Sequence, residues 1–235
     1  KKLSKPLFEL FPEISQGLIA YDKYQGQDEQ TIKNRVYHYD NFSKSDLKKW
    51  LWGEDVKKYI LKWNETEWLD YCDGIANPRD PKFFKEERIL IREITNPSIF
   101  ATITDEEYYH DPAIIIVKKS NSYSSKVLLA LLNSSLATFF HFNYSPKATK
   151  GAFPKIIVDD IRNFPLPQVT NQNIIKLEHL VDKILDKGII QSDISKELVK
   201  IDIIFYMHYN LIYEEIKIID LEFNLTQEEY NNYEI

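Results

Sequence analysis

The sequence contains a single cysteine, Cys72, in 235 residues. One cysteine excludes both an internal disulfide and a cysteine-based metal cluster. No segment approaches the roughly 20 consecutive apolar residues that a membrane-spanning helix needs, and no apolar run follows the basic N-terminus as it does in a signal peptide. These absences exclude the disulfide-rich secreted class and the membrane-spanning class, and they predict a cytoplasmic protein without a membrane partner.

Glycine and methionine are also scarce, at 6 and 1 residues. The phosphate-binding patterns Gly-x-Gly-x-x-Gly and Gly-x-x-x-x-Gly-Lys-Ser/Thr do not occur, and neither does the Gly-x-Ser-x-Gly turn of serine hydrolases. The 5 histidines lack the spacing of metal ligands. The chain begins at Lys1 rather than at methionine, so we expect it to be a segment of a longer protein, although a tag or processing would leave the same start.

Carboxylate patterns give little support for catalysis. The sequence Glu215-Ile216-Lys217 matches the Glu-x-Lys half of a nuclease metal site, in which carboxylates bind the metal and lysine contacts the phosphate. No Pro-Asp partner stands upstream, so an exposed helical face is the preferred interpretation. Asp159-Asp160 is an adjacent pair, and adjacent side chains on a strand point to opposite faces. The sequence therefore predicts no catalytic residue and no metal site.

Charge is distributed unevenly along the chain. The net charge is −6, but residues 168–235 contain 6 Lys and Arg against 13 Asp and Glu, while residues 1–167 are close to neutral. No acidic residue occurs within residues 112–158, which favours contact with a polyanion. Burial is the alternative explanation for residues 112–142, because charges are rare in a core. The interval nevertheless contains Lys118, Lys119, Lys126, Lys147, Lys150 and Lys155.

The apolar pattern predicts a β-rich body followed by helices. Runs of β-branched residues predict strands over residues 87–94 and 113–117, with weaker candidates at 37–39, 63–71, 98–109 and 156–158. Apolar residues at helical spacing predict one long central helix over residues 125–142 and further helices in the last third. We therefore predict an α+β fold. Residues 1–167 form the body, and residues 168–235 form a helical C-terminal tail that packs on the body or on a missing catalytic part.

The loop after the central helix combines residue types that suit DNA. Residues 143–155 contain lysines that can neutralise phosphates, together with Asn, Ser and Thr side chains that can recognise base edges. Two further segments, residues 21–27 and 55–59, mix basic and aromatic side chains, and Arg79, Arg88 and Arg92 supply guanidinium groups that suit guanine. The candidate DNA-binding residues are Tyr21, Lys23, Tyr24, Lys57, Lys58, Arg92, Asn143, Ser145, Lys147, Thr149, Lys150 and Lys155.

Several segments follow one another in a distinctive order. The most specific part is the helix Leu-x-x-Leu-Leu-Asn-Ser at residues 128–134, followed by the lysine loop and the sequence Phe-Pro-Leu-Pro at residues 164–167. The other segments are residues 14–23, 51–59, 87–92, 150–156 and 201–211. Their order resembles a known family, the TaqI-like C-terminal specificity domain of type IIG restriction–modification enzymes and adenine-specific DNA methyltransferases.

The resemblance implies that the chain is a double-stranded DNA recognition domain that is not an enzyme by itself. A methyltransferase domain N-terminal to it in a bacterial parent protein would flip out an adenine and methylate it with S-adenosylmethionine. The Asn-Pro-Pro-Tyr motif of such a domain is missing, since Asn77-Pro78-Arg79 and Asn96-Pro97-Ser98 do not match it. We therefore expect no cofactor in this chain. Because its net charge is acidic, we also expect the isolated chain to bind DNA weakly.

Two other functions stay open on the sequence alone. The first is a protein–protein interaction module of a multi-subunit complex, in which the aromatic surface and the acidic tail bind another subunit. The second is a nuclease whose metal site the motif search does not detect. The target DNA sequence, the side chains that contact bases and the parent protein's ability to cleave DNA are not encoded in any motif.

Overall fold

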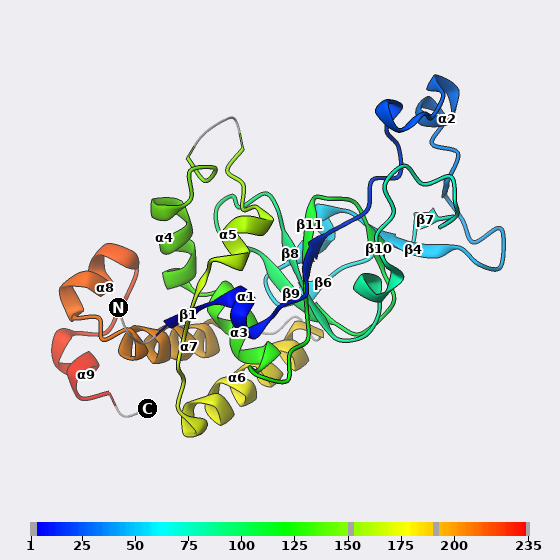
Figure 1. Cartoon of the computed structure of the whole chain (residues 1–235). Coiled ribbons are helices and arrows are strands. Elements are labelled where there is room, and N and C mark those ends of the chain that lie inside the picture. The colour runs from blue at the N-terminus through cyan, green and yellow to red at the C-terminus, as the bar shows by residue number, and fades with distance from the viewer. Residues whose placement is uncertain (1–3, 150–152, 190–192, 234–235) are drawn as a thin grey trace.

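The computed structural model describes residues 4–149, 153–189 and 193–233. Its centre is a four-stranded antiparallel sheet in the order β2-β11-β8-β9 (Figure 1). The predicted strands at residues 87–94 and 113–117 are confirmed as β8 and β11. The strand bounds are β2 Ile14–Gln16, β8 Arg88–Arg92, β9 Ala101–Thr104 and β11 Ile114–Lys118.

In the two central strands, residues 89–91 of β8 and 114–117 of β11 are all apolar because both faces of the sheet are covered. Ile89, Ile91, Ile115 and Val117 belong to one buried cluster, whereas the alternate residues Leu90, Ile114 and Ile116 belong to another. Successive side chains on a strand point to opposite faces, so each strand supplies both clusters in turn. The first cluster lies between the sheet and the helices, and the second lies between the sheet and a smaller lobe. The sheet therefore connects these two parts of the molecule.

The predicted central helix is broken into two, α3 Ser125–Leu132 and α4 Ser135–Tyr144. Asn133 ends α3, and the Ser134 hydroxyl accepts from Ala137 N at 3.0 Å as the N-cap of α4. The Asn133 side chain leaves the helix axis and bonds to the backbone of Ala101 in β9. The single-helix expectation was therefore wrong, because apolar spacing does not reveal a polar side chain whose partner lies on another strand.

The smaller lobe contains a second four-stranded sheet in the order β10-β4-β7-β3. Three of its strands, β3, β7 and β10, overlap the weaker sequence candidates, whereas β4 was not predicted. Short turns and helices surround them at one end of the molecule (Figure 1). The bounds in this lobe are η1 Lys23–Gln25, α2 Glu29–Lys33, β3 His38–Tyr39, β4 Lys48–Leu51, β7 Trp68–Leu69, η3 Pro81–Phe84 and β10 Tyr109–His110. Between β4 and β7, η2 Gly53–Asp55 leads into a hairpin of β5 Val56–Lys57 and β6 Ile60–Leu61, which packs against β8 and β9 of the main sheet.

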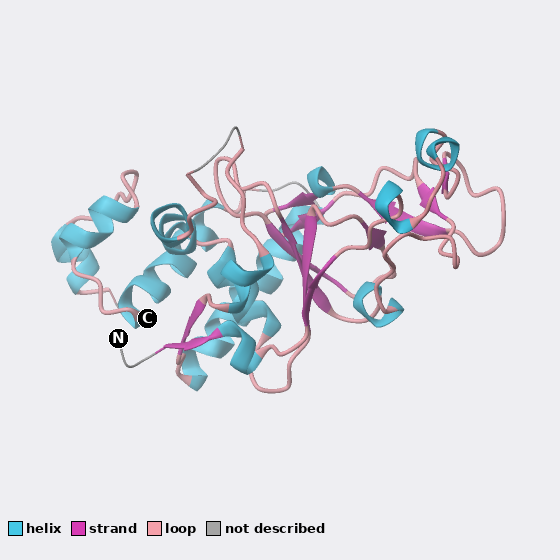
Figure 2. Cartoon of the chain, turned by 45° about the horizontal axis from the view of Figure 1, so that its top comes forward, coloured by secondary structure: helices cyan, strands magenta, loops and turns pink. Residues whose placement is uncertain are grey.

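Helices gather at the opposite end of the molecule (Figure 2), which confirms the α+β class with a helical C-terminal part. The predicted strand at residues 156–158 is wrong, because α5 begins at Val158 with the Asp160 carboxylate accepting from Ile157 N. The remaining bounds are β1 Ser4–Pro6, α1 Leu7–Leu10, α5 Val158–Arg162, β12 Pro165–Pro167, α6 Asn171–Ile189, α7 Ser195–His208, α8 Tyr213–Ile219 and α9 Gln227–Asn231.

The helical tail shares an apolar core with the body. Leu177 and Val181 of α6 and Phe205 of α7 lie in the same buried cluster as the sheet residues Ile91 and Ile115. The division after residue 167 stays a prediction. Within the described part of the chain, none of the helices has both the length and the apolar character needed to cross a membrane.

Candidate nucleic-acid interface

The turn η1 presents two of the candidate residues to solvent. The Asp22 carboxylate accepts from Tyr24 N at 2.8 Å, and Gly26 closes the turn with φ of 83°. Gln27 fastens the turn to the lobe, since its Nε2 donates to Ala20 O at 2.9 Å and to Gly74 O at 2.7 Å. Tyr24 is 83% exposed, and Lys23 Nζ lies 4.9 Å from the centre of its ring. An exposed aromatic ring beside a lysine suits stacking on a base next to a phosphate.

Tyr21 points inward and organises the lobe. Its hydroxyl accepts from Tyr37 N at 2.9 Å and lies 2.8 Å from His38 Nδ1, while its ring stacks on Tyr37 at 5.5 Å. Burial raises the pKa of Tyr21 to about 12 and lowers the pKa of His38 to about 3, because each charged form would lose water. The positive charge of Arg35 partly offsets the shift at Tyr21 and adds to the shift at His38. Tyr21 thus positions the segment that carries Lys23 and Tyr24.

The loop after α4 carries the second group of candidates. Lys147, Thr149 and Asn143 are exposed, whereas Ser145 is buried and donates its hydroxyl proton to Asp160 Oδ2 at 2.9 Å. Asn143 Nδ2 donates to Phe139 O at 2.8 Å, at the end of α4. Lys150 lies outside the described residues. In this loop, Ser145 fixes the backbone, and the exposed polar groups are those of Asn143, Lys147 and Thr149.

Lys155 and Arg92 both lie near the C-terminal end of β8. Lys155 forms an isolated bridge with Ile94, and its Nζ lies 3.0 Å from Glu93 Oε2. The Arg92 guanidinium lies 5.3 Å from the ring centre of Phe100 and lines a cavity of about 360 Å³. The other residues that line this cavity are Trp52, Gly53, Glu54, Ile94 and Ala113.

Lys57 and Lys58, neighbours in sequence, have different surroundings. Lys57 is exposed on β5, whereas Lys58 Nζ donates to Asn133 O at 3.1 Å between α3 and α4. Burial lowers the pKa of Lys58, and the nearby Asp202 partly offsets this effect. The structure therefore does not bring Lys58 together with the loop after α4 or with η1. Arg88, a further guanidinium candidate, is fully buried and cannot face a DNA groove.

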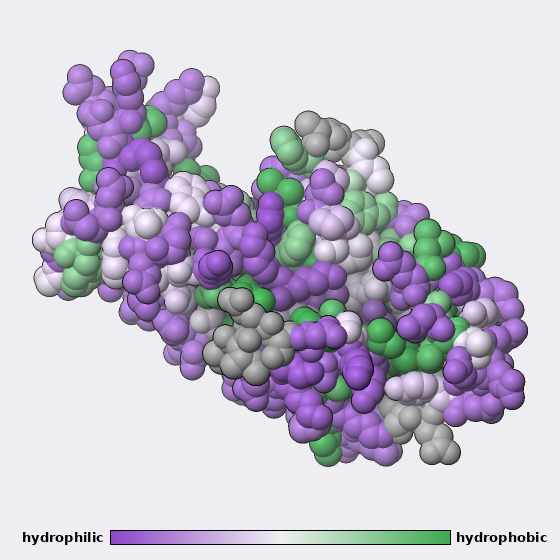
Figure 3. All heavy atoms as spheres, turned by 180° about the vertical axis from the view of Figure 1, so that it is seen from behind, coloured by the Kyte–Doolittle hydropathy of each residue, from purple (hydrophilic) through white to green (hydrophobic). Residues whose placement is uncertain are grey.

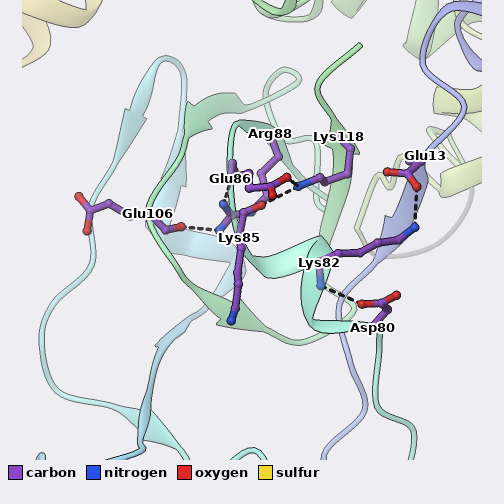
Figure 4. Close-up of polar contacts among 8 residues, drawn as sticks. All are labelled: Glu13, Asp80, Lys82, Lys85, Glu86, Arg88, Glu106 and Lys118. Atoms are coloured by element: carbon purple, nitrogen blue, oxygen red, sulfur yellow. Dashed lines mark hydrogen bonds and ion pairs between the residues drawn. The ribbon is translucent and has the colours of Figure 1, made fainter. Parts of the chain in front are cut away.

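Arg88 and Lys118 instead form a buried polar network at the far end of β8 (Figure 4). They are partners in the β8–β11 register, and Arg88 donates to the carbonyls of Glu86 and Glu106 at 2.8 Å each. Lys118 Nζ donates to Lys85 O at 2.6 Å and to Glu86 Oε2 at 3.2 Å. Desolvation lowers the pKa of Arg88 to about 10. These contacts hold the ends of β8 and β11 against the segments that lead to the small lobe.

Trp52, Arg35 and Glu67 are candidate site residues that sequence reasoning missed. The Trp52 indole Nε1 donates to Glu67 Oε2 at 2.6 Å, and the Arg35 guanidinium lies 5.3 Å from the Trp52 ring and pairs with Glu67. Trp52 lies in residues 51–59, one of the segments that resemble the specificity-domain family, and this resemblance could have pointed to it. No sequence pattern could have pointed to Arg35 and Glu67, because the two residues pair across 32 positions of the chain.

The exposed candidates of η1 and of the loop after α4 lie on two projections from the same side of the molecule, whereas Lys57 on β5 lies on neither. Figure 1 shows the lobe that contains α2 rising at one end and the loop between α4 and α5 rising nearer the other, with the main sheet between them. From behind, the surface between the two projections is hollowed, and hydrophobic side chains gather towards the helical end (Figure 3). Within the described segments, no three His, Cys, Asp or Glu side chains are placed to hold a metal ion.

A family model described as the TaqI-like C-terminal specificity domain matches residues 48–166, which confirms the resemblance seen in the sequence. No curated protein matches the chain. Among solved structures, the type IIL restriction–modification enzyme MmeI in complex with DNA shares the fold at a TM-score of 0.61 and 14% identity. The match covers 97% of this chain but 37% of that one, so the chain spans little more than a third of its neighbour.

A structure of a type I restriction–modification system also matches, with 14% identity and a TM-score of 0.48. This match covers 92% of the present chain and 44% of the other.

Proposed function

Since the chain belongs to the family of TaqI-like C-terminal specificity domains, we infer that it recognises a target sequence in double-stranded DNA. The family match over residues 48–166 carries this inference. The two projections support it, because a lysine and an exposed aromatic ring lie on one and Lys147 lies on the other. Phosphate contacts would set the position of the duplex, and base contacts from the hollow between the projections would supply specificity.

The finer part of the inference concerns the whole parent protein. We expect this chain to be the recognition part of an N6-adenine DNA methyltransferase or of a bifunctional type II restriction–modification enzyme. It would work beside an N-terminal methyltransferase domain that binds S-adenosylmethionine. The residues of this chain do not fit that cofactor, since neither of its Asn-Pro pairs continues into Asn-Pro-Pro-Tyr. Recognition and methylation would therefore be divided between two parts of one enzyme, with no catalytic residue in this part.

Salt-dependent binding to random duplex DNA tests the inference. Each phosphate contact adds roughly 0.9 to the slope of log affinity against log salt, so Lys147→Ala should reduce that slope by about 1. Lys200→Ala provides the matched control, because Lys200 is also an exposed lysine but lies on α7 in the tail. Equal slopes for Lys147→Ala and the unsubstituted chain would remove the loop from the interface. No binding at low salt would contradict DNA recognition by the isolated chain.

A further inference from the structure

The outward face of α4 is apolar over most of its length. Leu136, Phe139, Phe140 and Tyr144 project from it, and none of these four side chains is fully buried. The rings of Phe140 and Tyr144 stack with centres 4.9 Å apart and planes 17° apart, so they form one ridge. Tyr144 is 74% exposed. A stacked aromatic ridge on the surface is a large apolar area that water solvates poorly.

A cavity of about 460 Å³ lies along one side of this ridge, between α4 and α8. Phe139 and Phe140 form one wall, and Leu211, Ile218 and Ile219 form the other. The groove continues past Leu211 into a second cavity of about 330 Å³ that extends to Pro165 and Pro167 of β12. The two cavities share Leu136, Phe140 and Leu211, so they form one apolar groove alongside α4.

The surface is also hollowed on the other side of the ridge, towards α5. A cavity of about 270 Å³ there is lined by Phe140, Tyr144 and Ile156, together with the acidic residues Asp159 and Asp160. Phe140 and Tyr144 therefore stand between two depressions. A partner that straddles the ridge would bury apolar side chains on its crest and place polar side chains on both flanks.

Both flanks of the ridge are acidic. Glu215 lines the α8 cavity and is exposed, and Asp159 lines the α5 cavity and is exposed. The sequence of α4 contributes no acidic residue and no lysine or arginine. Two described cations near the flanks are engaged, since Lys217 Nζ donates to Phe223 O at 2.9 Å and the Arg162 guanidinium lies 5.8 Å from the Phe8 ring. The flanks thus favour positive charge in whatever covers the ridge.

We propose that this face binds an amphipathic helix of a protein partner, with an apolar stripe over Phe140 and Tyr144 and lysine or arginine along both edges of the stripe. The length of α4 is roughly 15 Å, which matches about three turns of such a helix. The same acidic flanks repel DNA and anionic lipid. This surface is therefore distinct from the candidate DNA interface, although the loop that carries Lys147 begins where α4 ends.

Binding of a synthetic helical peptide to the full chain tests the proposal. The probe is a fluorescent peptide of about 14 residues with a leucine stripe and lysine edges, and its matched control carries glutamate edges. Fluorescence anisotropy should show that the lysine peptide binds at least about tenfold more tightly than the glutamate peptide. High salt should reduce this difference, because the charges lie at the surface.

Two variants, made at isoleucines of nearly equal exposure, locate the site. Ile218 in the groove is 66% exposed, and Ile175 on α6, which lies outside the groove lining, is 67% exposed. Ile218→Asp should weaken binding of the lysine peptide about tenfold or more, whereas Ile175→Asp should leave binding unchanged. Both side chains are exposed, so neither change should prevent folding, and far-UV circular dichroism checks this.

Four results would overturn the proposal. Equal affinity of the lysine and glutamate peptides would show that the acidic flanks do not contribute to binding. Equal weakening by Ile175→Asp and Ile218→Asp would place the peptide elsewhere. Self-association of the chain that Ile218→Asp abolishes, without any binding of the lysine peptide, would show that a second copy covers the groove. DNA binding that depends on Ile218 but not on Lys147 would also contradict the assignment.

Discussion

The side chain of Asn133 and the backbone of Ala101 form a reciprocal pair of hydrogen bonds. Ala101 N donates to Asn133 Oδ1 at 3.0 Å, and Asn133 Nδ2 donates to Ala101 O at 3.0 Å. The amide thus takes the place of a neighbouring strand at the edge of β9. Because Ala101 and Asn133 are both buried, neither group could find water if its partner were lost.

Asn133→Ala should destabilise the protein strongly. The change leaves the buried Ala101 N without a partner, whereas Ala101 O still accepts from Tyr59 N at 2.8 Å. One unsatisfied buried group costs about 1–3 kcal/mol, so we expect the free energy of unfolding in urea to fall by about that amount. Asn143→Ala is the control, since Asn143 is exposed and a change there should cost within about 0.5 kcal/mol. Similar losses for the two variants would show that the Asn133–Ala101 pair contributes little.

Asp202 should give the protein a specific pH dependence. Its carboxylate accepts from Ser135 N and Ser135 Oγ at 2.9 Å each, with Lys58 and Asp220 nearby, and burial raises its pKa to about 6. A folded-state pKa above the unfolded value means that the favourable contribution is present below about pH 4 and is lost as the pH rises through about 6. Across that interval, the unfolding free energy should fall by up to about 3 kcal/mol relative to Asp202→Asn.

The control for that titration is Asp193→Asn. Hydrogen bonds from Ser195 N and Ser195 Oγ lower the pKa of Asp193, so its contribution is present above the unfolded pKa and is lost as the pH falls. Denaturant unfolding at a series of pH values should therefore give differences of opposite sign for the two variants. A flat difference between the unsubstituted chain and Asp202→Asn would contradict the raised pKa.

Gly17 and Gly26 should differ sharply in their tolerance of alanine. A Cβ at Gly17 would lie 2.0 Å from Asp111 O and 2.3 Å from His110 O, which are backbone atoms where β10 leads into β11. Gly17→Ala should therefore separate the small lobe from the main sheet and cost more than about 3 kcal/mol. Gly26 has φ of 83° and open space around it, so Gly26→Ala should cost about 1 kcal/mol. Thermal unfolding of both variants measures the contrast.

Tyr24 and Tyr21 should separate DNA binding from folding. Tyr24→Ala removes a ring that is 83% exposed, and loss of stacking on a base should weaken DNA binding by about 1–3 kcal/mol without changing stability. Tyr21→Phe removes the acceptor of Tyr37 N and should destabilise the lobe by about 1–2 kcal/mol. Anisotropy with labelled duplex and urea unfolding distinguish the two effects. Unchanged DNA affinity in Tyr24→Ala would remove η1 from the interface.

The elements that could be predicted from the sequence are those whose signal lies within the element itself. The middle residues of β8 and β11 are all apolar because each strand supplies two cores. The capping box of Thr226 and Glu229 is complete within four residues. The break between α3 and α4 could not be predicted, because the partner of Asn133 lies 32 residues away. The same limit applied to Lys58, whose partner Asn133 is 75 positions further along the chain.

The ladder between β1 and β12 fixes the two points at which the chain joins the recognition body. Ser4 pairs with Pro167, Lys5 with Leu166 and Pro6 with Pro165, so the first and last strands of the body lie side by side. The chain between β1 and β12 therefore starts and ends at the same place in the molecule. A lengthened turn in the small lobe, whose buried cluster is separate from the one that holds α6 and α7, would therefore change what the far end of the molecule can reach without moving the helices that follow Pro167. Such an arrangement allows one attachment to serve many different targets.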